Sequence, residues 1–460
     1  MEDSGADARF AQLCELAARE MERLTVPGVA IGVADGEREH VAGLGVTSID
    51  NPLPVDADTL FQIGSTSKTI TATAAMRLAE QGRLSLDAPV REYLPDLRLA
   101  DEGVAARVTL RHLFNHTGGW AGDYFDDLGG GDDALARIVE RMRDLPQLTP
   151  LGEVWSYNNA GFYVAGRVIE VVSGATFERT IDELVLAPLG MRRSLFFAGD
   201  IMTYRFAAGH LNSFEPGAPR AVVARPWPLA RTAHPAGGIS STVRDQLRYA
   251  RFHMGDGSAP DGTRLLSAAS IAQMQTPTAP AANGEFSGIS WFIKDVAGGR
   301  IVRHGGATLG QLSAFVMVPA RRFAITVLTN ADRGDELNRA VVKLALELFP
   351  GLAEPDPAPL ETPDAQLGEY AGSYESMASR LELAVESGRL RVQLTPKGGF
   401  PTKDSPPEPA PPPVLAALCG PNQLIVLDEP LAGARGEFLR DAAGRIVWLR
   451  IGGRVHARQG

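Results

Sequence analysis

A proline-rich segment close to residue 350 limits what this chain can fold into. The run PGLAEPDPAPLETPD, residues 350–364, carries five prolines, and proline removes the backbone N–H that helix interiors and central strands require. Such a run favours an extended linker. The sequence therefore predicts a large domain over residues 1–350, a linker over 351–363 and a small all-β domain over 364–460.

Length and composition agree with a globular protein of more than one core. The chain has 460 residues, of which 44% are hydrophobic and 22% are charged. A net charge of −10 without a basic block disfavours a nucleic-acid partner. No run approaches the roughly 18 apolar residues of a membrane span, and the amino terminus lacks a signal-like apolar segment. We expect a cytoplasmic protein that acts on small molecules without a membrane partner; the sequence predicts no oligomeric state.

The first 350 residues mix helical and strand-like patterns. Apolar periodicity predicts helices over 8–24 and 335–348 and a mostly helical stretch over 65–190. Strand-like runs follow residue 26 and recur at 301–303, 312–318 and 323–329, as in an antiparallel meander. Beyond the linker, short alternating strands are expected in LGEYAGSYES, LELAVESGRLRVQL, NQLIVLDE and GRIVWLRIGG, interrupted by PPEPAPPP. The predicted fold class is α/β, followed by a small all-β domain.

One lysine stands out because lysines are rare in this chain. Only five of the 45 basic residues are lysines, and Lys68 lies in FQIGSTSKTI, three residues after Ser65. Arginine cannot lose its proton near neutral pH, whereas a lysine in a dry site can become a neutral amine and accept one. A helix predicted from Ser65 to Gly82 would point its positive dipole end at an oxyanion beside Ser65. The pair therefore suggests an activated serine nucleophile.

Two further motifs could complete a serine-x-x-lysine site. Tyr157 is followed by Asn159, a phenol that can relay protons and an amide that can hold the lysine and a substrate carbonyl. The pattern histidine-x-glycine occurs at His116 and at His304, and we choose His304 because it follows a strand.

Metal and cofactor sites are not expected. His112 and His116 have helical metal-ligand spacing but lack a nearby third ligand, so both are interpreted as structural histidines. The acidic loop at 126–133 lacks the final glutamate of an EF-hand and is interpreted as a solvated loop. The only two cysteines, Cys14 and Cys419, lie far apart, so no disulfide framework is expected.

These motifs carry a family resemblance over residues 8 to 349. Ser65-x-x-Lys68, Tyr157-x-Asn159 and His304-Gly305-Gly306, with LRHLFNHTGGW and AGGISSTVRD, resemble the class C β-lactamases and penicillin-binding-protein-like serine hydrolases. The resemblance implies an antiparallel sheet flanked by helices, an all-helical domain, and an active site between them. It implies oxyanion donors from the backbone N–H groups of Ser65 and Ala307. The tail resembles the barrel-like, lipocalin-like modules of some members. The substrate-binding residues expected here are Asn159, Gly305, Gly306, Ala307, Trp120 and Tyr124.

The third motif departs from that of true class C β-lactamases, which carry lysine where this chain has His304. The resemblance therefore implies weak or no β-lactamase activity. We expect a metal-independent hydrolase that forms an acyl-enzyme on Ser65 with small esters, or with amides or peptides that can contain D-residues. Lys68 and Tyr157 would transfer protons, and His304 with Asn159 would orient the substrate. The alternatives are acyl transfer to an amine, as in peptide-cyclising thioesterases, a true β-lactamase, and least of all a non-catalytic binding protein.

Overall fold

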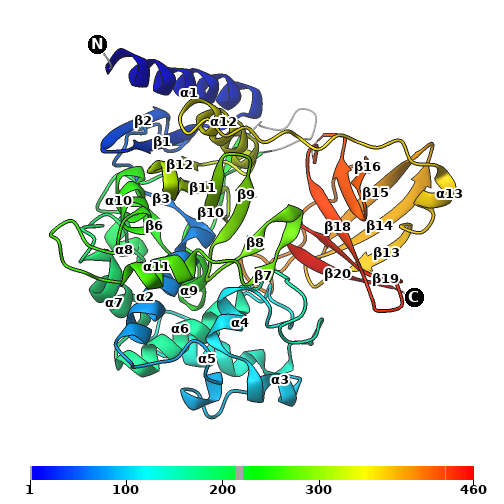
Figure 1. Cartoon of the computed structure of the whole chain (residues 1–460), viewed down its shortest axis with the longest axis horizontal. Coiled ribbons are helices and arrows are strands. Elements are labelled where there is room, and N and C mark those ends of the chain that lie inside the picture. Colours follow the sequence, from blue (N-terminus) through cyan, green and yellow to red (C-terminus); the bar gives the residue numbers. More distant parts are fainter. Residues whose placement is uncertain (1–2, 213–220, 430, 460) are drawn as a thin grey trace.

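An eight-stranded antiparallel sheet forms the centre of the larger part of the chain (Figure 1). The structure is a computed structural model that describes residues 3–212, 221–429 and 431–459. The strand order is β2-β1-β12-β11-β10-β9-β8-β7. The strands are β1 (Gly28–Asp35), β2 (Arg38–Gly45), β7 (Ala279–Pro280), β8 (Phe286–Ser287), β9 (Phe292–Val296), β10 (Gly299–Thr308), β11 (Gln311–Val318) and β12 (Phe323–Thr329). β1 pairs with β12, with Val29 opposite Thr329, so the two ends of this domain meet in one sheet.

The two faces of this sheet are covered by different helices. Valine or isoleucine at positions 29, 31 and 33 of β1 packs in one core with α1 (Asp3–Leu24) and α12 (Gly334–Leu348). Small residues at 30, 32 and 34 face α10 (Val243–Met254), where a Cβ on Gly32 would lie 3.1 Å from side-chain atoms of Val243 and Leu247. The alternation of large and small residues along β1 therefore lets α10 approach closely.

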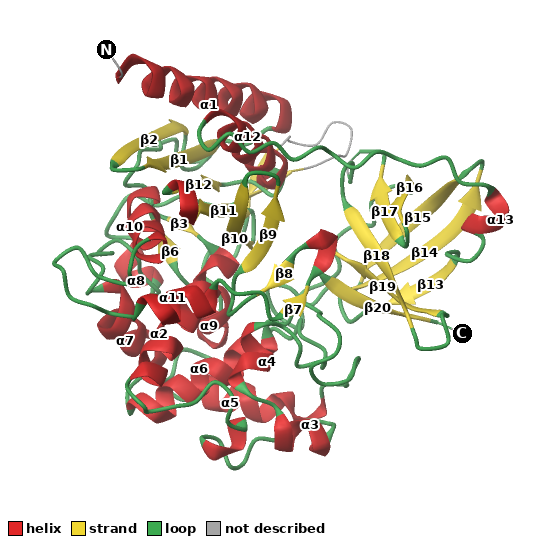
Figure 2. Cartoon of the chain, in the orientation of Figure 1, coloured by secondary structure: helices red, strands yellow, loops and turns green. Residues whose placement is uncertain are grey.

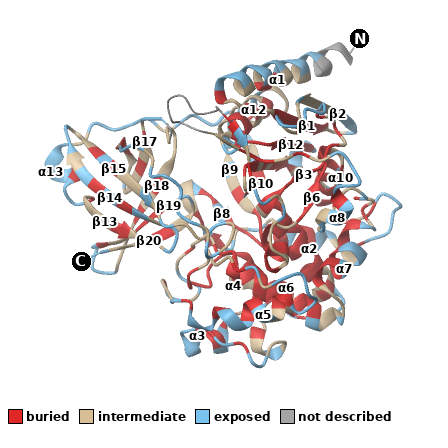
Figure 3. Ribbon diagram, turned by 180° about the vertical axis from the view of Figure 1, so that it is seen from behind, coloured by how far each residue is buried: buried red, intermediate tan, exposed pale blue. Residues whose placement is uncertain are grey.

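A helical region packs beneath the sheet, and Figure 2 shows it as the part of the molecule richest in helices. Its helices are α2 (Ser67–Glu80), α3 (Glu102–Arg107), α4 (Leu110–Phe114), α5 (Ala134–Arg141), α6 (Ala160–Ser173), α7 (Phe177–Ile181), α8 (Ala198–Ile201), α9 (His234–Gly237) and α11 (Ala268–Met274). Two small sheets join β3 (Phe61–Gln62) to β6 (Ser240–Ser241) and β4 (His210–Asn212) to β5 (Ala221–Val223). α2 is buried along most of its length between α6 and α9 (Figure 3). It is the central helix of the region.

The carboxyl-terminal part is a closed barrel of eight strands, which confirms the predicted all-β domain. Its elements are α13 (Asp364–Leu367), β13 (Gly372–Glu375), β14 (Ser379–Glu386), β15 (Arg389–Pro396), β16 (Val414–Gly420), β17 (Gln423–Val426), β18 (Arg435–Arg440), β19 (Ile446–Ile451) and β20 (Arg454–Arg458). The barrel has its own apolar core, and residues 351–363 form neither helix nor strand. In the described part of the chain, no helix is long and apolar enough to cross a membrane.

Three barrel strands, β16, β18 and β20, are absent from the sequence-based prediction. β16 has the sequence VLAALCG, whose continuous apolar character does not show the alternation of a half-buried strand. β18 and β20, RGEFLR and RVHAR, are short and rich in arginine. One of these arginines, Arg454 at the start of β20, pairs with Asp123 of the larger domain.

Candidate active site

Ser65 is the accessible residue in a long buried stretch. It lies in a single 3-10 turn, Gly64–Thr66, which directly precedes α2. Every other residue from 59 to 76 is buried, while Ser65 is partly exposed. Ser65 is therefore accessible at the amino-terminal end of a buried helix, as the sequence predicted. The helix itself begins two residues later than predicted, at Ser67, and Ser65 lies in the 3-10 turn before it.

The strand carrying the third motif lies directly against this turn. β9 pairs with β10 only as far as Arg303, so the same edge of residues 304–308 is free to face Ser65. A Cβ added to Gly306 would lie 2.0 Å from the Ile63 carbonyl oxygen and 2.7 Å from the Ser65 nitrogen, and one added to Gly64 would lie 2.7 Å from the Ala307 nitrogen. Glycine at both positions thus brings the N–H groups of Ser65 and Ala307 close together. This is the geometry that an oxyanion hole requires.

Lys68 has the environment of a general base. Its side chain is 0% exposed, and Nζ lies 3.0 Å from Ser65 Oγ and donates to the Ala236 carbonyl at 2.5 Å. Burial lowers the pKa of Lys68 well below its ordinary value, and the positive charge of Arg454 lowers it further, against the opposing charge of Asp123. As a neutral amine, Lys68 can keep its bond to Ala236 and accept the Ser65 proton across the same 3.0 Å contact.

Tyr157 is set up to give a proton rather than to take one. Burial raises the pKa of its phenol, and the Ser65 hydroxyl only partly opposes that rise. Its buried hydroxyl has no hydrogen-bond partner of good geometry among the described residues. The ring stacks on His116 at 4.3 Å between centroids and lies 5.0 Å from Lys68 Nζ. Tyr157 therefore stays protonated near neutral pH, and the base of the pair is Lys68.

His304 is a neutral hydrogen-bond acceptor in this site. It is 2% exposed, and its Nδ1 donates to the Gly305 carbonyl at 2.6 Å, so Nε2 carries the lone pair. Burial lowers the pKa of His304 to about 3, with Lys68 as the next cause. Nε2 is buried and unpartnered within the part of the chain that the structure describes. An uncharged imidazole thus stands where a fixed cation would attract a carboxylate.

Asn159 is held by residues that sequence reasoning missed. Its Nδ2 donates to Asp123 Oδ1 at 2.9 Å, and no hydrogen bond joins it to Lys68 among the described residues. Asp123 also accepts from Nε and Nη2 of Arg454 on β20, at 3.0 and 3.1 Å. Burial would raise the pKa of Asp123, but Arg454 outweighs it and keeps that pKa low, so the carboxylate is charged. No local motif marks this pair, because 331 residues separate its members.

His116 also belongs to the site, although the sequence suggested only a structural role. It stacks on Tyr157, and its Nδ1 accepts from the Asn158 N–H at 3.1 Å. Phe292 lies nearby, 5.1 Å from the His304 ring and 6.4 Å from the Tyr157 ring. The Tyr157 and His304 motifs are therefore joined by an aromatic cluster. Among the described residues, no group of three or more histidine, cysteine, aspartate or glutamate side chains could hold a metal ion.

Two residues expected to bind substrate, Trp120 and Tyr124, make other contacts in the structure. Trp120 is 3% exposed and packs in the core of the larger domain. Tyr124 is half-buried, and its hydroxyl donates to Asp126 at 3.3 Å. Their part in substrate binding stays a prediction.

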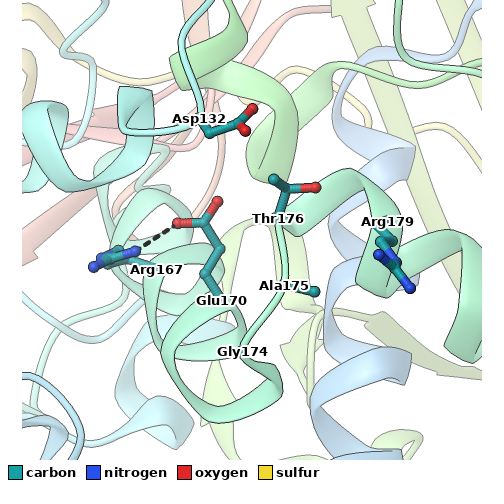
Figure 4. Close-up of a pocket in the computed structure, with 7 residues that line it drawn as sticks. All are labelled: Asp132, Arg167, Glu170, Gly174, Ala175, Thr176 and Arg179. Carbon is teal, nitrogen blue, oxygen red and sulfur yellow. Dashed lines mark hydrogen bonds and ion pairs between the residues drawn. The ribbon is translucent and has the colours of Figure 1, made fainter.

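A separate hollow lies at the other end of α6. It has a volume of about 420 Å³ and is lined by Asp132, Arg167, Glu170, Gly174, Ala175, Thr176 and Arg179 (Figure 4). Arg167 pairs with Glu170 at 3.0 Å, so these charges already compensate each other. The first residue of α6 that lines this hollow, Arg167, lies two turns beyond Asn159, about 12 Å along the helix axis. It is not part of the Ser65 site.

Comparisons with known proteins agree with this geometry. The Beta-lactamase family model matches residues 15–347. The chain is 35% identical over 359 residues to Penicillin-binding protein 4 of Amycolatopsis lactamdurans, covering 76% of this chain and 93% of that protein. It is 36% identical over 194 residues to Esterase EstB of Burkholderia gladioli, covering 39% and 49%.

Solved structures extend the likeness to the barrel. The crystal structure of SurE is 25% identical, with a TM-score of 0.75 and coverage of 100% of both chains. A class C β-lactamase from Rhodobacter sphaeroides shares the fold over 73% of this chain and 98% of its own, at 24% identity and a TM-score of 0.59. The fold is that of the serine hydrolases related to β-lactamases and penicillin-binding proteins. The chain belongs to the beta-lactamase family, which confirms the resemblance found in the sequence.

Proposed function

We propose that this protein hydrolyses small esters, or amide and peptide bonds that can contain D-residues, through an acyl-enzyme on Ser65. The observation that carries the proposal is the buried amine of Lys68, 3.0 Å from the Ser65 hydroxyl, with its pKa well below the ordinary value. A nucleophilic serine needs such a base, and an exposed, permanently charged lysine could not serve. We propose a small ester, amide or peptide as the substrate.

The reaction follows from the proton positions. Ser65 Oγ bonds to the carbonyl carbon while its proton moves to Lys68, and the N–H groups of Ser65 and Ala307 bind the oxyanion. The leaving alcohol or amine takes a proton from Tyr157, which regains one from the Lys68 ammonium. Water then attacks the acyl carbon, and the reverse transfers release the acid and restore Ser65.

The charges around the site support uncharged substrates. His304 is neutral, and the guanidinium of Arg454 is occupied by Asp123 in a bidentate pair. The substrate carboxylate of a β-lactam would therefore meet no fixed, unpaired cation at the third motif. The similarity to an esterase supports an ester substrate, and a relative named Unguisins hydrolase of Aspergillus campestris, 27% identical over 430 residues, supports hydrolysis.

A substrate screen with mass spectrometry tests the proposal. We expect p-nitrophenyl acetate or D-amino-acid amides to turn over far faster than nitrocefin, and a slow ester to leave its acyl group on Ser65. Ser65→Ala should retain the fold and lose turnover. An acyl group found on another residue, or turnover retained by Ser65→Ala, would overturn the nucleophile assignment. Adding an amine acceptor distinguishes the rival reaction, because acyl transfer would give an amide in place of the free acid.

A further inference from the structure

The barrel contacts the larger domain at the Tyr157 motif itself. The turn between β19 and β20 lies on residues 155–157, and these red strands adjoin β7 and β8 (Figure 1). The Tyr157 N–H donates to the Gly453 carbonyl at 2.8 Å, and the Val455 N–H donates to Ser156 Oγ at 3.2 Å. A Cβ on Gly453 would lie 3.2 Å from the Trp155 ring. The backbone next to Tyr157 is thus fixed by the backbone of the barrel.

A buried arginine anchors the same contact. Arg450 on β19 is 5% exposed and donates to the carbonyls of Trp155 at 3.0 Å and Ala281 at 3.2 Å, both in the larger domain. It is also paired with Glu437 of the barrel. A buried guanidinium is costly unless its donors are satisfied. Here the acceptors of Nη1 and Nη2 come from both domains, whereas Nε has no partner among the described residues. The two Nη groups therefore favour the docked arrangement.

Arg454 extends this contact into the catalytic centre. Its Cζ lies 4.7 Å from the centroid of the Tyr157 ring, within the range of a cation–π interaction. Its guanidinium donates hydrogen bonds to both carboxylate oxygens of Asp123, and the same carboxylate accepts a hydrogen bond from the Asn159 amide. One side chain of the barrel therefore touches the first residue of the Tyr157-x-Asn159 motif and, through Asp123, orients the second.

We propose that Arg454 is a positioning residue for catalysis and that the docked barrel completes the active site. The inference rests on the proposed function, because it concerns the same centre. Arg454 acts here through Tyr157 and Asn159 and is not a binding site for a substrate carboxylate, since Asp123 already occupies its bidentate face.

The ion pair of Arg454 and Asp123 also influences the pKa of Lys68. The groups that face its amine are Tyr157, His116, His304, Asp123 and Arg454. Of these, Arg454 lowers the pKa of Lys68 and Asp123 raises it. Removing either member of the pair should therefore move the pH profile, and the two shifts should have opposite signs. A residue with only a structural role would not produce this pattern.

The test measures kcat and KM for p-nitrophenyl acetate, and the rate at which a fluorophosphonate labels Ser65, in Arg454→Met. We expect kcat and the labelling rate to fall about 10- to 100-fold, as for a displaced catalytic group, while KM changes little. The acid limb of kcat/KM should move to higher pH in Arg454→Met and to lower pH in Asp123→Asn. Arg454→Lys should recover part of the loss, because lysine restores the positive charge but not the pair of parallel hydrogen bonds that arginine donates to Asp123.

The matched control is Arg445→Met, which removes an exposed arginine at the opposite end of β19; among the described residues, its side chain pairs only with nearby Asp441. It should leave kcat unchanged. An unchanged kcat in Arg454→Met, a rise in KM alone, or an equal loss in Arg445→Met would overturn the inference. If Arg454→Met does not fold, the neutral polar variant Arg454→Gln takes its place, and the opposite pH shifts of Arg454→Gln and Asp123→Asn decide the inference. Failure of wild-type labelling at Ser65 would instead refute the proposed function.

Discussion

Replacing Gly306 by alanine should open the oxyanion hole. The added Cβ would lie 2.0 Å from the Ile63 carbonyl oxygen and 2.7 Å from the Ser65 nitrogen. Carbon and oxygen atoms approach to about 3.3 Å, so β10 and the Ser65 turn would have to separate by about 1.3 Å. Both neighbours are backbone atoms, which cannot rotate away as the end of a side chain can.

The expected loss in kcat follows from that displacement. Oxyanion donors act at about 2.7–3.1 Å, and losing one of them costs about 100- to 1000-fold in kcat. Overpacking should also lower the free energy of unfolding by about 1–3 kcal/mol. We therefore expect Gly306→Ala to fold, to keep KM within a small factor, and to lose kcat by about two to three orders of magnitude.

The first glycine of the same strand provides the control. A Cβ on Gly299 would have side-chain carbons of Leu352 and Val318 as its nearest neighbours, at 3.5 to 3.7 Å, so Gly299→Ala should remain close to wild type in the same p-nitrophenyl ester assay. Urea unfolding of both variants separates a loss of stability from a loss of catalysis. A Gly306→Ala enzyme with wild-type kcat, or equal losses in the two variants, would refute the reasoning.

Three further predictions concern protonation. Lys68→Arg keeps the positive charge but removes the base, so kcat should fall about 100-fold or more, and wild-type activity would contradict the base assignment. The pKa of His304 is lowered to about 3, below the unfolded value near 6.5, so its contribution to stability is present above pH 6.5 and is lost as pH falls toward 3. Wild type should therefore lose up to about 1.4 kcal/mol per pH unit more than His304→Gln in urea titrations, and equal slopes would contradict it. His304→Lys should raise the nitrocefin rate relative to the p-nitrophenyl acetate rate; an unchanged ratio would contradict the role given to the missing cation.

The proximity of Ser65 and Lys68 could be predicted because they lie about one helical turn apart in the sequence, and a turn of helix places two such side chains on the same side. The approach of β10 to Ser65 could be expected from the glycines of His304-Gly305-Gly306, since only glycine permits such contact. Asp123 and Arg454 could not be found in this way. Their partnership depends on how two domains dock, and no local pattern encodes a distance across that interface. For the same reason, the proline-rich linker indicated two units but gave no sign that one of them reaches the catalytic centre of the other.

The position of Arg454 also orders events during synthesis. Domains generally fold from the amino terminus as the chain emerges from the ribosome. Ser65, Lys68, Tyr157 and His304 are all made before the first barrel strand, whereas the partner of Asp123 arrives only with β20. Until then, the Asp123 carboxylate that accepts from the Asn159 amide lacks the arginine that holds it in place. The nascent larger domain therefore lacks one support of its Tyr157-x-Asn159 motif, so hydrolytic competence should appear late, when the newly made barrel docks.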